Sequence, residues 1–227
     1  MRTVPSQIRA LEGCCKANKG PLAREAVLAS MMAVVTGLSA QLYIYLGPVP
    51  YTMQNFGVIL SGLLLSPRYA LLSQLLYLTL VAAGAPLAAG MRGGLPVVAG
   101  PTAGYLWGFP LASALASMLA RPHLAEKRLA RAWLMCIVAS APIYALGAAW
   151  LRLWLQALGS LEGLYALASA LGVGQSPDVA VLVAGVLVFL PQDALMDDAL
   201  AVLAAAKAYK LIGAGIASSG FNRAAAP

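Results

Sequence analysis

Three acidic residues lie close together in an apolar segment near the C-terminal end of the sequence. Asp193, Asp197 and Asp198 follow the segment Phe189-Leu190-Pro191-Gln192. On an α-helix, Asp193 and Asp197 are four residues apart and share one face. Because an ionisable side chain is costly inside a membrane helix, such a residue by default marks a ligand or ion site. The other interpretation is that these acids are solvated caps at a helix start, since Pro191 comes just before Asp193.

Two further polar groups follow segments that are rich in proline or glycine. Tyr51, Thr52, Gln54 and Asn55 come after Gly47-Pro48-Val49-Pro50, and Thr102 and Tyr105 lie within 100–105. Non-helical backbone at membrane depth is tolerated only where protein or a cavity covers it. A proline-rich entry into a short apolar helix therefore predicts a loop that dips into a cavity. Polar groups that converge on one face of an apolar bundle are typical of a small-ligand pocket.

The sequence carries little that is typical of enzyme or metal chemistry. Its only histidine is His123, in a charged loop, and its three cysteines are Cys14, Cys15 and Cys136. No zinc-binding spacing, phosphate-binding loop or nucleophile elbow is present. We therefore predict no catalytic residue, no metal, no cofactor and no ATPase activity within this chain. A membrane enzyme that uses the pair Asp193 and Asp197 is the least favoured hypothesis.

The elements that must position these residues are membrane helices. The sequence is 61% hydrophobic and only 10% charged, whereas soluble domains carry about 25% charged residues. No charged residue occurs between Glu25 and Arg68, or between Arg131 and Arg152. These patterns predict an all-α, polytopic membrane protein. We expect a bundle of six transmembrane helices, with spans near residues 22–46, 53–65, 69–87, 102–119, 132–155 and 179–206. The last of these is either one kinked span or a short outer segment that leads into a span starting near Phe189.

Positive charge predicts the orientation of these spans in the cell (cytoplasmic) membrane. With both termini in the cytoplasm, only Arg92 and Arg152, of the 15 Lys and Arg residues, fall on the outer side. The net charge of +7 is then a topology signal, and we expect no nucleic-acid partner. The predicted organisation is a basic cytoplasmic tail over 1–21, a six-helix substrate-binding domain over 22–210 and a cytoplasmic tail over 211–227. All three polar groups then lie on the outer side.

Small residues indicate how the helices pack. Gly100, Gly104, Gly108, Ala112, Ala116 and Ala120 recur every four residues, which lets helix backbones approach closely. We expect this stripe to pack within the bundle. Ala29 and Ala33, with Gly37, form a second stripe on the first span. A terminal helix can face either its own bundle or another subunit, so this stripe either packs within the bundle or contacts a partner. Ala29 and Ala33 are the candidates for a partner interface.

Four segments, in order, resemble the BioY family, the biotin-binding S components of energy-coupling factor (ECF) transporters. They are 49–54, 75–86, 100–106 and 189–193, which read VPYTMQ, LLYLTLVAAGAP, GPTAGYL and FLPQD. The resemblance implies a six-helix bundle that takes up the vitamin biotin from outside, with a transmembrane coupling subunit and two ATPases supplying the energy, although some relatives occur without a dedicated coupling subunit. The residues that the resemblance and the polar motifs point to as binding biotin are Thr52, Gln54, Tyr77, Thr102, Tyr105, Asp193 and Asp197.

One departure from the family pattern concerns the carboxylate of biotin. The family's last motif usually has Gly where Gln192 stands and Lys where Met196 stands. A buried carboxylate needs a cation or several hydrogen-bond donors. Arg92 or Arg152 could supply the charge, backbone amides and hydroxyls could suffice, or the ligand could differ in its tail. The acidic helix without a lysine also motivates an alternative function, a self-sufficient, proton-coupled secondary transporter of biotin or a related small carboxylate.

Overall fold

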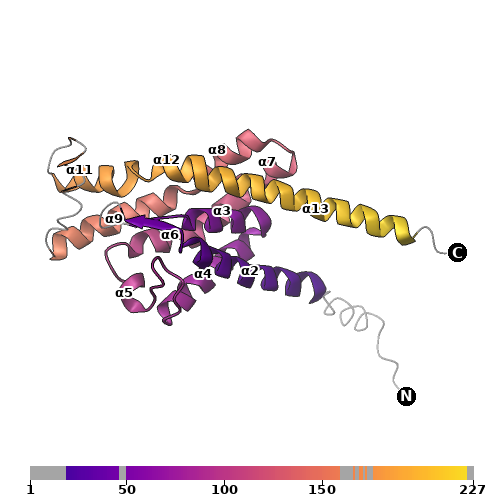
Figure 1. Cartoon of the computed structure of the whole chain (residues 1–227), viewed down its shortest axis with the longest axis horizontal. Coiled ribbons are helices and arrows are strands. Elements are labelled where there is room, and N and C mark those ends of the chain that lie inside the picture. The colour runs from indigo at the N-terminus through magenta and orange to yellow at the C-terminus, as the bar shows by residue number, and fades with distance from the viewer. Residues whose placement is uncertain are drawn as a thin grey trace, which may run out of the picture.

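Helices dominate the structure, a computed structural model that describes residues 19–45, 50–158, 166, 169–170, 172 and 176–223 (Figure 1). The first half comprises α2 (Lys19–Ser39), β1 (Tyr43–Tyr45), β2 (Pro50–Thr52), α3 (Gln54–Leu64), α4 (Pro67–Ala82), α5 (Leu95–Val98) and α6 (Ala103–Leu119). The second half comprises α7 (Arg121–Ala125), α8 (Leu129–Ala139), α9 (Ala141–Leu158), α11 (Pro177–Leu182), the π-helix η1 (Val183–Leu187), α12 (Leu190–Gln192), the π-helix η2 (Asp193–Asp198) and α13 (Ala199–Arg223).

Helices occupy all six of the ranges that hydropathy marks as spans. Within the described residues, two continuous helical runs are long and apolar enough to cross a membrane, Leu129–Ala157 with 29 residues and Asp178–Leu211 with 34. Two shorter apolar helices, Gln54–Leu64 and Ala103–Leu119, lie between other helices. The all-α prediction therefore holds for the bundle, whereas the number of membrane crossings stays a prediction.

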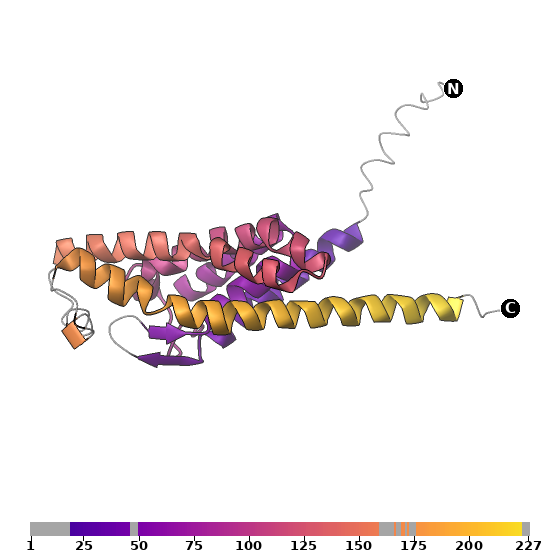
Figure 2. The same ribbon diagram turned by 90° about the horizontal axis from the view of Figure 1, so that it is seen from above.

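A short β-hairpin follows the first helix, and the sequence did not predict it. The helix ends at Ser39, and β1 then pairs antiparallel with β2, with Tyr43 opposite Thr52 and Tyr45 opposite Pro50. The segment Tyr43-Ile44-Tyr45 contains only aromatic and β-branched residues, which favour strands. From hydropathy alone, this apolar segment is predicted to continue the helix. Figure 2 shows the hairpin beside the C-terminal helical run, at the end of the bundle that holds α11.

The small-residue stripe on α6 packs inside the bundle, as predicted. A methyl group added at Gly104 would lie 2.4 Å from the Leu146 carbonyl oxygen, and one at Gly108 would lie 2.5 Å from Ile143 Cα. α9 therefore approaches α6 so closely that only glycine fits at these two positions. Further along the same stripe, Ala112 and Ala116 are fully buried, and an added methyl at Gly62 of α3 would lie 2.6 Å from Ala116 Cβ. α6 is thus the helix around which α3 and α9 pack.

The stripe on α2 also faces inward. Ala33 is fully buried and Ala29 is only 6% exposed. Ala29 packs against Leu65 and Ala70 of the same chain. Ala29 and Ala33 therefore pack within this chain, as the small-residue spacing allowed, and their place at a partner interface stays a prediction. The exposed face of α2 instead carries large apolar side chains, namely Val27, Met31, Val34 and Leu38.

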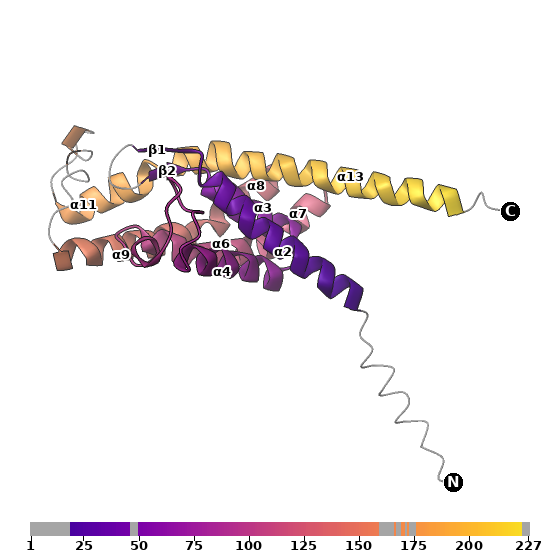
Figure 3. The same ribbon diagram turned by 60° about the horizontal axis from the view of Figure 1, so that its bottom comes forward.

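The first described residues of α2 and the last turns of α13 project from the same end of the bundle (Figures 1 and 3). The location of both termini in the cytoplasm stays a prediction. α13 continues to Arg223, so the helix extends beyond residue 210, where the predicted domain ends. Most of the predicted basic tail, residues 1–18, lies outside the described residues.

The tight contact between α6 and α9 gives a first prediction. We expect Gly108→Ala to lower the stability of the folded protein by about 1–3 kcal/mol, because the added methyl group meets backbone atoms that cannot rotate away. Thermal unfolding of the purified protein in detergent measures this loss. Leu111→Ala is the control on the same helix, since Leu111 is 48% exposed and should tolerate truncation. Equal melting temperatures for Gly108→Ala and the unmodified protein would contradict the packing described above.

Candidate functional site

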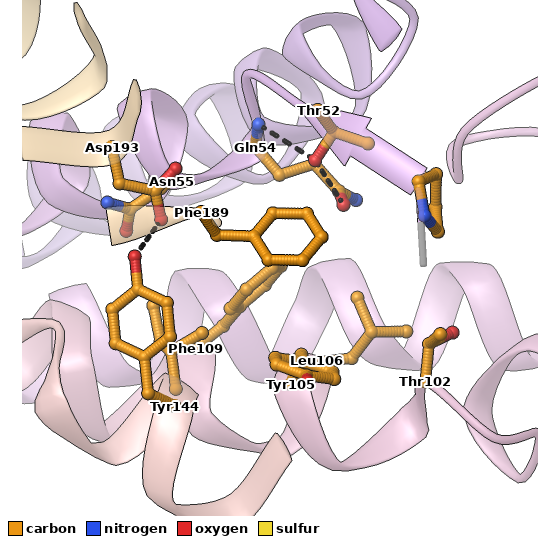
Figure 4. A pocket seen from close by; sticks show the side chains of 12 residues that line it. Thr52, Gln54, Asn55, Thr102, Tyr105, Leu106, Phe109, Tyr144, Phe189 and Asp193 are labelled. Atoms are coloured by element: carbon orange, nitrogen blue, oxygen red, sulfur yellow. Dashed lines mark hydrogen bonds between the residues drawn. The ribbon is translucent and has the colours of Figure 1, made fainter. Parts of the chain in front are cut away.

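A small cavity of about 80 Å³ lies where the hairpin, α3, α6, α9 and the C-terminal helical run meet (Figure 4). Its polar lining residues are Thr52, Gln54, Asn55, Thr102, Tyr105, Tyr144 and Asp193. Its apolar lining residues are Pro50, Leu106, Phe109, Ile143 and Phe189. The cavity thus combines side chains from five parts of the chain that are far apart in sequence.

One end of the cavity carries a carboxyl group with a tyrosine partner. The Tyr144 hydroxyl donates a hydrogen bond to Asp193 Oδ2, and Asn55 lies next to this pair in Figure 4. Asn55 Nδ2 donates to Asp198 Oδ1 at 3.1 Å, and its carbonyl oxygen accepts from Ser140 at 3.4 Å. These bonds fix the acceptor oxygens of Asp193 and Asn55 at this end.

A second polar wall comes from the junction of β2 and α3. The Thr52 hydroxyl donates to Gln54 Oε1 at 3.1 Å, and Gln54 Nε2 donates to the Tyr77 hydroxyl at 2.6 Å. Tyr77 in turn donates to the Leu87 carbonyl at 3.3 Å and is fully buried. Tyr77, predicted as a binding residue, therefore lies behind Gln54 and holds it in place without lining the cavity.

Aromatic rings form the apolar side of the cavity. Phe189 lies across its centre in Figure 4 and stacks on Tyr51 with 4.7 Å between the ring centroids. Tyr51 also donates a hydrogen bond to the Val188 carbonyl. Burial, and secondly the charge of Asp193, raise the pKa of the Tyr51 hydroxyl, so Tyr51 stays a neutral donor. The hairpin is thereby attached to the segment that carries Phe189.

Tyr105 lines the cavity with its aromatic ring, while its hydroxyl group is hydrogen-bonded to the backbone of another element. The hydroxyl donates to the Gly185 carbonyl at 2.7 Å. A methyl group at Gly147 would lie 2.2 Å from the Tyr105 ring, so the glycine makes room for this ring on α9. Tyr105 therefore offers an aromatic surface, and its polar atom joins α6 to η1.

A second, larger cavity of about 370 Å³ adjoins the first one. The two share Pro50, Gln54, Thr102 and Leu106, and the larger one adds Arg92. Arg92 Nε donates to the Ala89 carbonyl at 3.0 Å, which orients its guanidinium group. Arg152, the other cation predicted on the outer side, forms an ion pair with Asp178 at 2.5 Å and lines neither of these cavities. Of the two arginines, Arg92 is the one beside the site.

The acids of η2 divide between two locations. Asp193 lines the cavity, whereas Asp197 and Asp198 are buried behind it. Asp197 accepts from the Phe56 backbone amide at 3.1 Å and from Gln192 at 3.4 Å. The prediction placed Asp193 and Asp197 on one helical face because it assumed α-helical spacing, but residues 193–198 form a π-helix, in which hydrogen bonds run from i to i+5. Met196 is half exposed and lines neither cavity.

The predicted site residues and the observed lining overlap in part. The predicted residues that line the cavity are Thr52, Gln54, Thr102, Tyr105 and Asp193. Tyr77 and Asp197 support it from behind. Sequence reasoning missed Tyr144, although a tyrosine just after Ala141-Pro142 in an apolar span was an available signal. It also missed Phe109 and Ile143, because apolar residues in a hydrophobic helix carry no signal of their own. Phe189 belongs to the segment 189–193 that resembles the family, but it was not predicted to bind the ligand.

The lining of the cavity has the composition of a small-ligand site. Among the described residues, no group of three or more His, Cys, Asp or Glu side chains is placed to hold a metal ion. The lining offers hydrogen-bond acceptors and donors around aromatic faces, which is the usual make-up of a small-molecule pocket. The fold and the cavity together are typical of a helical membrane protein with a small-ligand pocket.

Comparison with known families identifies the group. The model of the BioY family matches residues 9–214, so this chain belongs to the BioY family. The chain is 50% identical over 95 residues to the probable biotin transporter BioY of Bacillus subtilis, covering 42% of this chain and 50% of that protein. It is 37% identical over 126 residues to the biotin transporter BioY of Thermotoga maritima, covering 55% of this chain and 72% of that protein. These names describe transporters and not enzymes.

A solved structure shares the fold. The S-component for biotin from an ECF-type ABC transporter superposes with a TM-score of 0.63 at 20% sequence identity, covering 84% of this chain and 93% of the other. In sequence, the matches to the B. subtilis protein and to a probable biotin transporter BioY of Pyrococcus horikoshii span only 50% and 59% of the length of those relatives. The fold is therefore shared along most of the chain, whereas close sequence similarity is confined to part of it.

The hydrogen bond between Asn55 and Asp198 gives a second prediction. We expect Asn55→Leu to destabilise the ligand-free protein by about 1–3 kcal/mol, because it leaves the buried Asp198 carboxyl without its donor. The double variant Asn55→Leu/Asp198→Leu should recover most of this loss, since replacing both partners removes the unsatisfied group. Thermal unfolding of the three proteins in one detergent measures the cycle. A double variant that is less stable than Asn55→Leu alone would refute this role of the pair.

Proposed function

We propose that this chain is the biotin-binding membrane subunit of an uptake system, and that the two adjoining cavities hold biotin. The observation that carries the proposal is the pairing of a polar, aromatic cavity with a larger one that contains Arg92, in a chain of the BioY family. Biotin has the same two parts, a fused ring system with a cyclic urea and a tail that ends in a carboxylate.

The inner cavity suits the ring system of biotin. The two N–H groups of the urea need acceptors, and Asp193 and Asn55 present oxygens at one end of the cavity. The thioether sulfur and the apolar ring edges suit aromatic neighbours, which Phe189 and Phe109 provide. The cavity of about 80 Å³ is narrow, so the ligand fits by moving Phe189 from its position across the centre.

The outer cavity suits the tail. A carboxylate is held most strongly by charge-assisted hydrogen bonds from a guanidinium group, and Arg92 borders the larger cavity next to Thr102. This assignment takes up one of the alternatives that the missing lysine left open. Arg152 is less suitable, because it lines neither cavity.

The membrane setting follows from the charge pattern. We place six spans in the cytoplasmic membrane with both termini inside, so that the hairpin, α5 and the cavities face outward. An ECF-type coupling subunit and two ATPases would then release biotin to the cytoplasm. Since Ala29 and Ala33 are buried within the chain, the exposed apolar face of α2 with Val27, Met31 and Leu38 is the surface of this helix that such a subunit could contact.

A second candidate function is a self-sufficient, proton-coupled transporter of biotin or a related carboxylate. Within the described part of the chain, Asp193, Asp197 and Asp198 bond to tyrosine, amide and backbone groups rather than to lysine or arginine. Uptake of biotin into vesicles that contain this protein alone, and its loss on addition of an uncoupler, would favour this function. A strict requirement for ATPase partners would exclude it.

Replacing Arg92 tests the proposed position of the carboxylate. We expect Arg92→Gln to weaken biotin binding by about 10- to 100-fold, since a hydrogen bond to a charged group contributes about 1.5–3 kcal/mol. Binding of biotin amide, which has no carboxylate, should be the same in Arg92→Gln and in the unmodified protein. Titration of the purified protein with labelled biotin and biotin amide measures both affinities.

Arg152→Gln is the matched control, because it removes an outer arginine that pairs with Asp178 instead of facing the cavities. We expect it to bind biotin as tightly as the unmodified protein. If the unmodified protein fails to bind biotin at micromolar concentration, the proposed function is wrong. If Arg92→Gln weakens the amide as much as biotin, Arg92 maintains the fold of the site and does not bind the carboxylate.

A further inference from the structure

A third cavity, of about 710 Å³, lies between the α7–α8 turn and α13, and it shares no lining residue with the proposed biotin site. Three lysines line it, Lys127 from the turn and Lys207 and Lys210 from α13. Its apolar wall includes Leu124, Leu129 and Ala206. The cavity therefore combines concentrated positive charge with a hydrophobic surface.

The acid next to Lys127 in sequence is engaged by another cation. The acid of the turn, Glu126, pairs with Arg128 at 3.0 Å. Within the described residues, no salt bridge involves Lys127, Lys207 or Lys210. Lys207 and Lys210 are three residues apart on α13 and so lie on one face of that helix. An anion that enters the cavity would thus meet three exposed ammonium groups.

Lys127 occupies an unusual backbone position. Its φ is +60°, and α7 ends with hydrogen bonds from Arg128 N to His123 O at 2.9 Å and from Lys127 N to Leu124 O at 3.0 Å. This is the Schellman pattern, in which glycine usually holds the left-handed position. A side chain here carries a backbone cost that glycine avoids. The structure thus has a lysine at a position that disfavours any side chain, and that lysine lines the cavity.

Hydrogen bonds hold the helices on either side of the cavity in place. Arg121 Nε donates to the Tyr209 hydroxyl at 3.0 Å, and its Nη1 donates to the Leu65 carbonyl at 3.0 Å. Tyr209 itself donates to the Leu63 carbonyl at 3.1 Å. α7 and α13 are thereby both tied to the α3 region. The cavity is formed by the fold itself.

The cavity also lies at the ends of two long apolar helical runs. The apolar run Leu129–Ala157 begins beside it, and the run Asp178–Leu211 ends beside it. Residues at the ends of long apolar helices meet the interface between hydrocarbon and water. Basic pockets between helices at this depth are suited to the phosphates of anionic lipids.

We propose that this cavity binds an anionic phospholipid, with its phosphate among Lys127, Lys207 and Lys210 and an acyl chain against Leu124, Leu129 and Ala206. A free inorganic phosphate offers the same charge but nothing for the apolar wall. An acidic protein segment would supply negative charge from outside the membrane. It would not cover the apolar wall, which continues onto the apolar helices. The combination favours a lipid.

Native mass spectrometry of the full chain tests the proposal with phosphatidylglycerol and phosphatidylcholine as probes. We expect the unmodified protein to retain phosphatidylglycerol preferentially. Lys127→Gly/Lys207→Gln/Lys210→Gln should bind it on the order of 100-fold more weakly, since each basic residue near an anionic headgroup contributes about a fivefold change. The control Arg24→Gln/Arg68→Gln/Arg131→Gln loses the same charge from exposed sites outside the cavity and should bind nearly as well as the unmodified protein.

Lys127→Gly alone separates binding from folding. It should weaken phosphatidylglycerol binding about fivefold, while the melting temperature without lipid stays the same or rises, because glycine relieves the left-handed backbone. Biotin binding, measured on the same samples, should not change in any of these variants. A failure of the lipid proposal is therefore distinguishable from a failure of the proposed function.

Several results would overturn the lipid proposal. Equal retention of phosphatidylcholine, or an equal loss in the arginine control, would show that the cavity has no preference for an anionic headgroup. Displacement of phosphatidylglycerol by millimolar inorganic phosphate would assign the cavity to free phosphate. Unchanged lipid binding in the lysine variant, together with lost assembly with a coupling module, would assign the surface to a protein partner.

Discussion

The structure depends on one constraint, that polar groups buried in an apolar bundle must find partners inside the protein. Gln74 shows this most clearly, since it is fully buried and its amide nitrogen donates to Thr36 at 3.2 Å and to Ser61 at 3.1 Å. Ser61 bonds Ser113 at 2.9 Å. One network therefore joins α2, α3, α4 and α6. Close approach at glycines permits these bonds, and the bonds in turn fix the register of the helices.

The same constraint builds the site. Gln54 and Asn55 begin the buried helix α3, and each is held from behind, by Tyr77 and by Asp198 respectively. Asp193 has its own partner in Tyr144. The residues that line the cavity are thus oriented by a second set of buried polar residues, which explains why Tyr77 and Asp197 carry the chemical character of site residues without reaching the cavity. A polar residue in an apolar helix therefore indicates that a site is nearby. The backbone conformation determines whether its side chain lines the cavity or lies behind the lining residues.

The sequence predicted the helices and the three polar segments because hydropathy and turn residues are local signals. It did not predict the end of α2 at Ser39 or the hairpin, since Tyr43-Ile44-Tyr45 is as apolar as a helix would be. The burial of Ala29 and Ala33 depends on which face of α2 meets α3 and α4, and small-residue spacing is the same for either face. Tyr144 becomes a site residue only through its contact with Asp193, 49 positions away.

The two π-helices explain how the C-terminal helical run contributes side chains both to the cavity and to the opposite end of the molecule. η1 and η2 lie at the cavity end, where Phe189 and Asp193 must point toward α6 and α9. A π-turn shifts the phase of a helix, so the side chains that follow turn to a different face. Beyond η2, regular α-helix resumes and places Lys207 and Lys210 at the opposite end of the molecule. There, regular α-helical spacing is sufficient to bring the two lysines onto one face. Within this helical run, the π-helical backbone therefore lies in the region where individual side chains line the cavity.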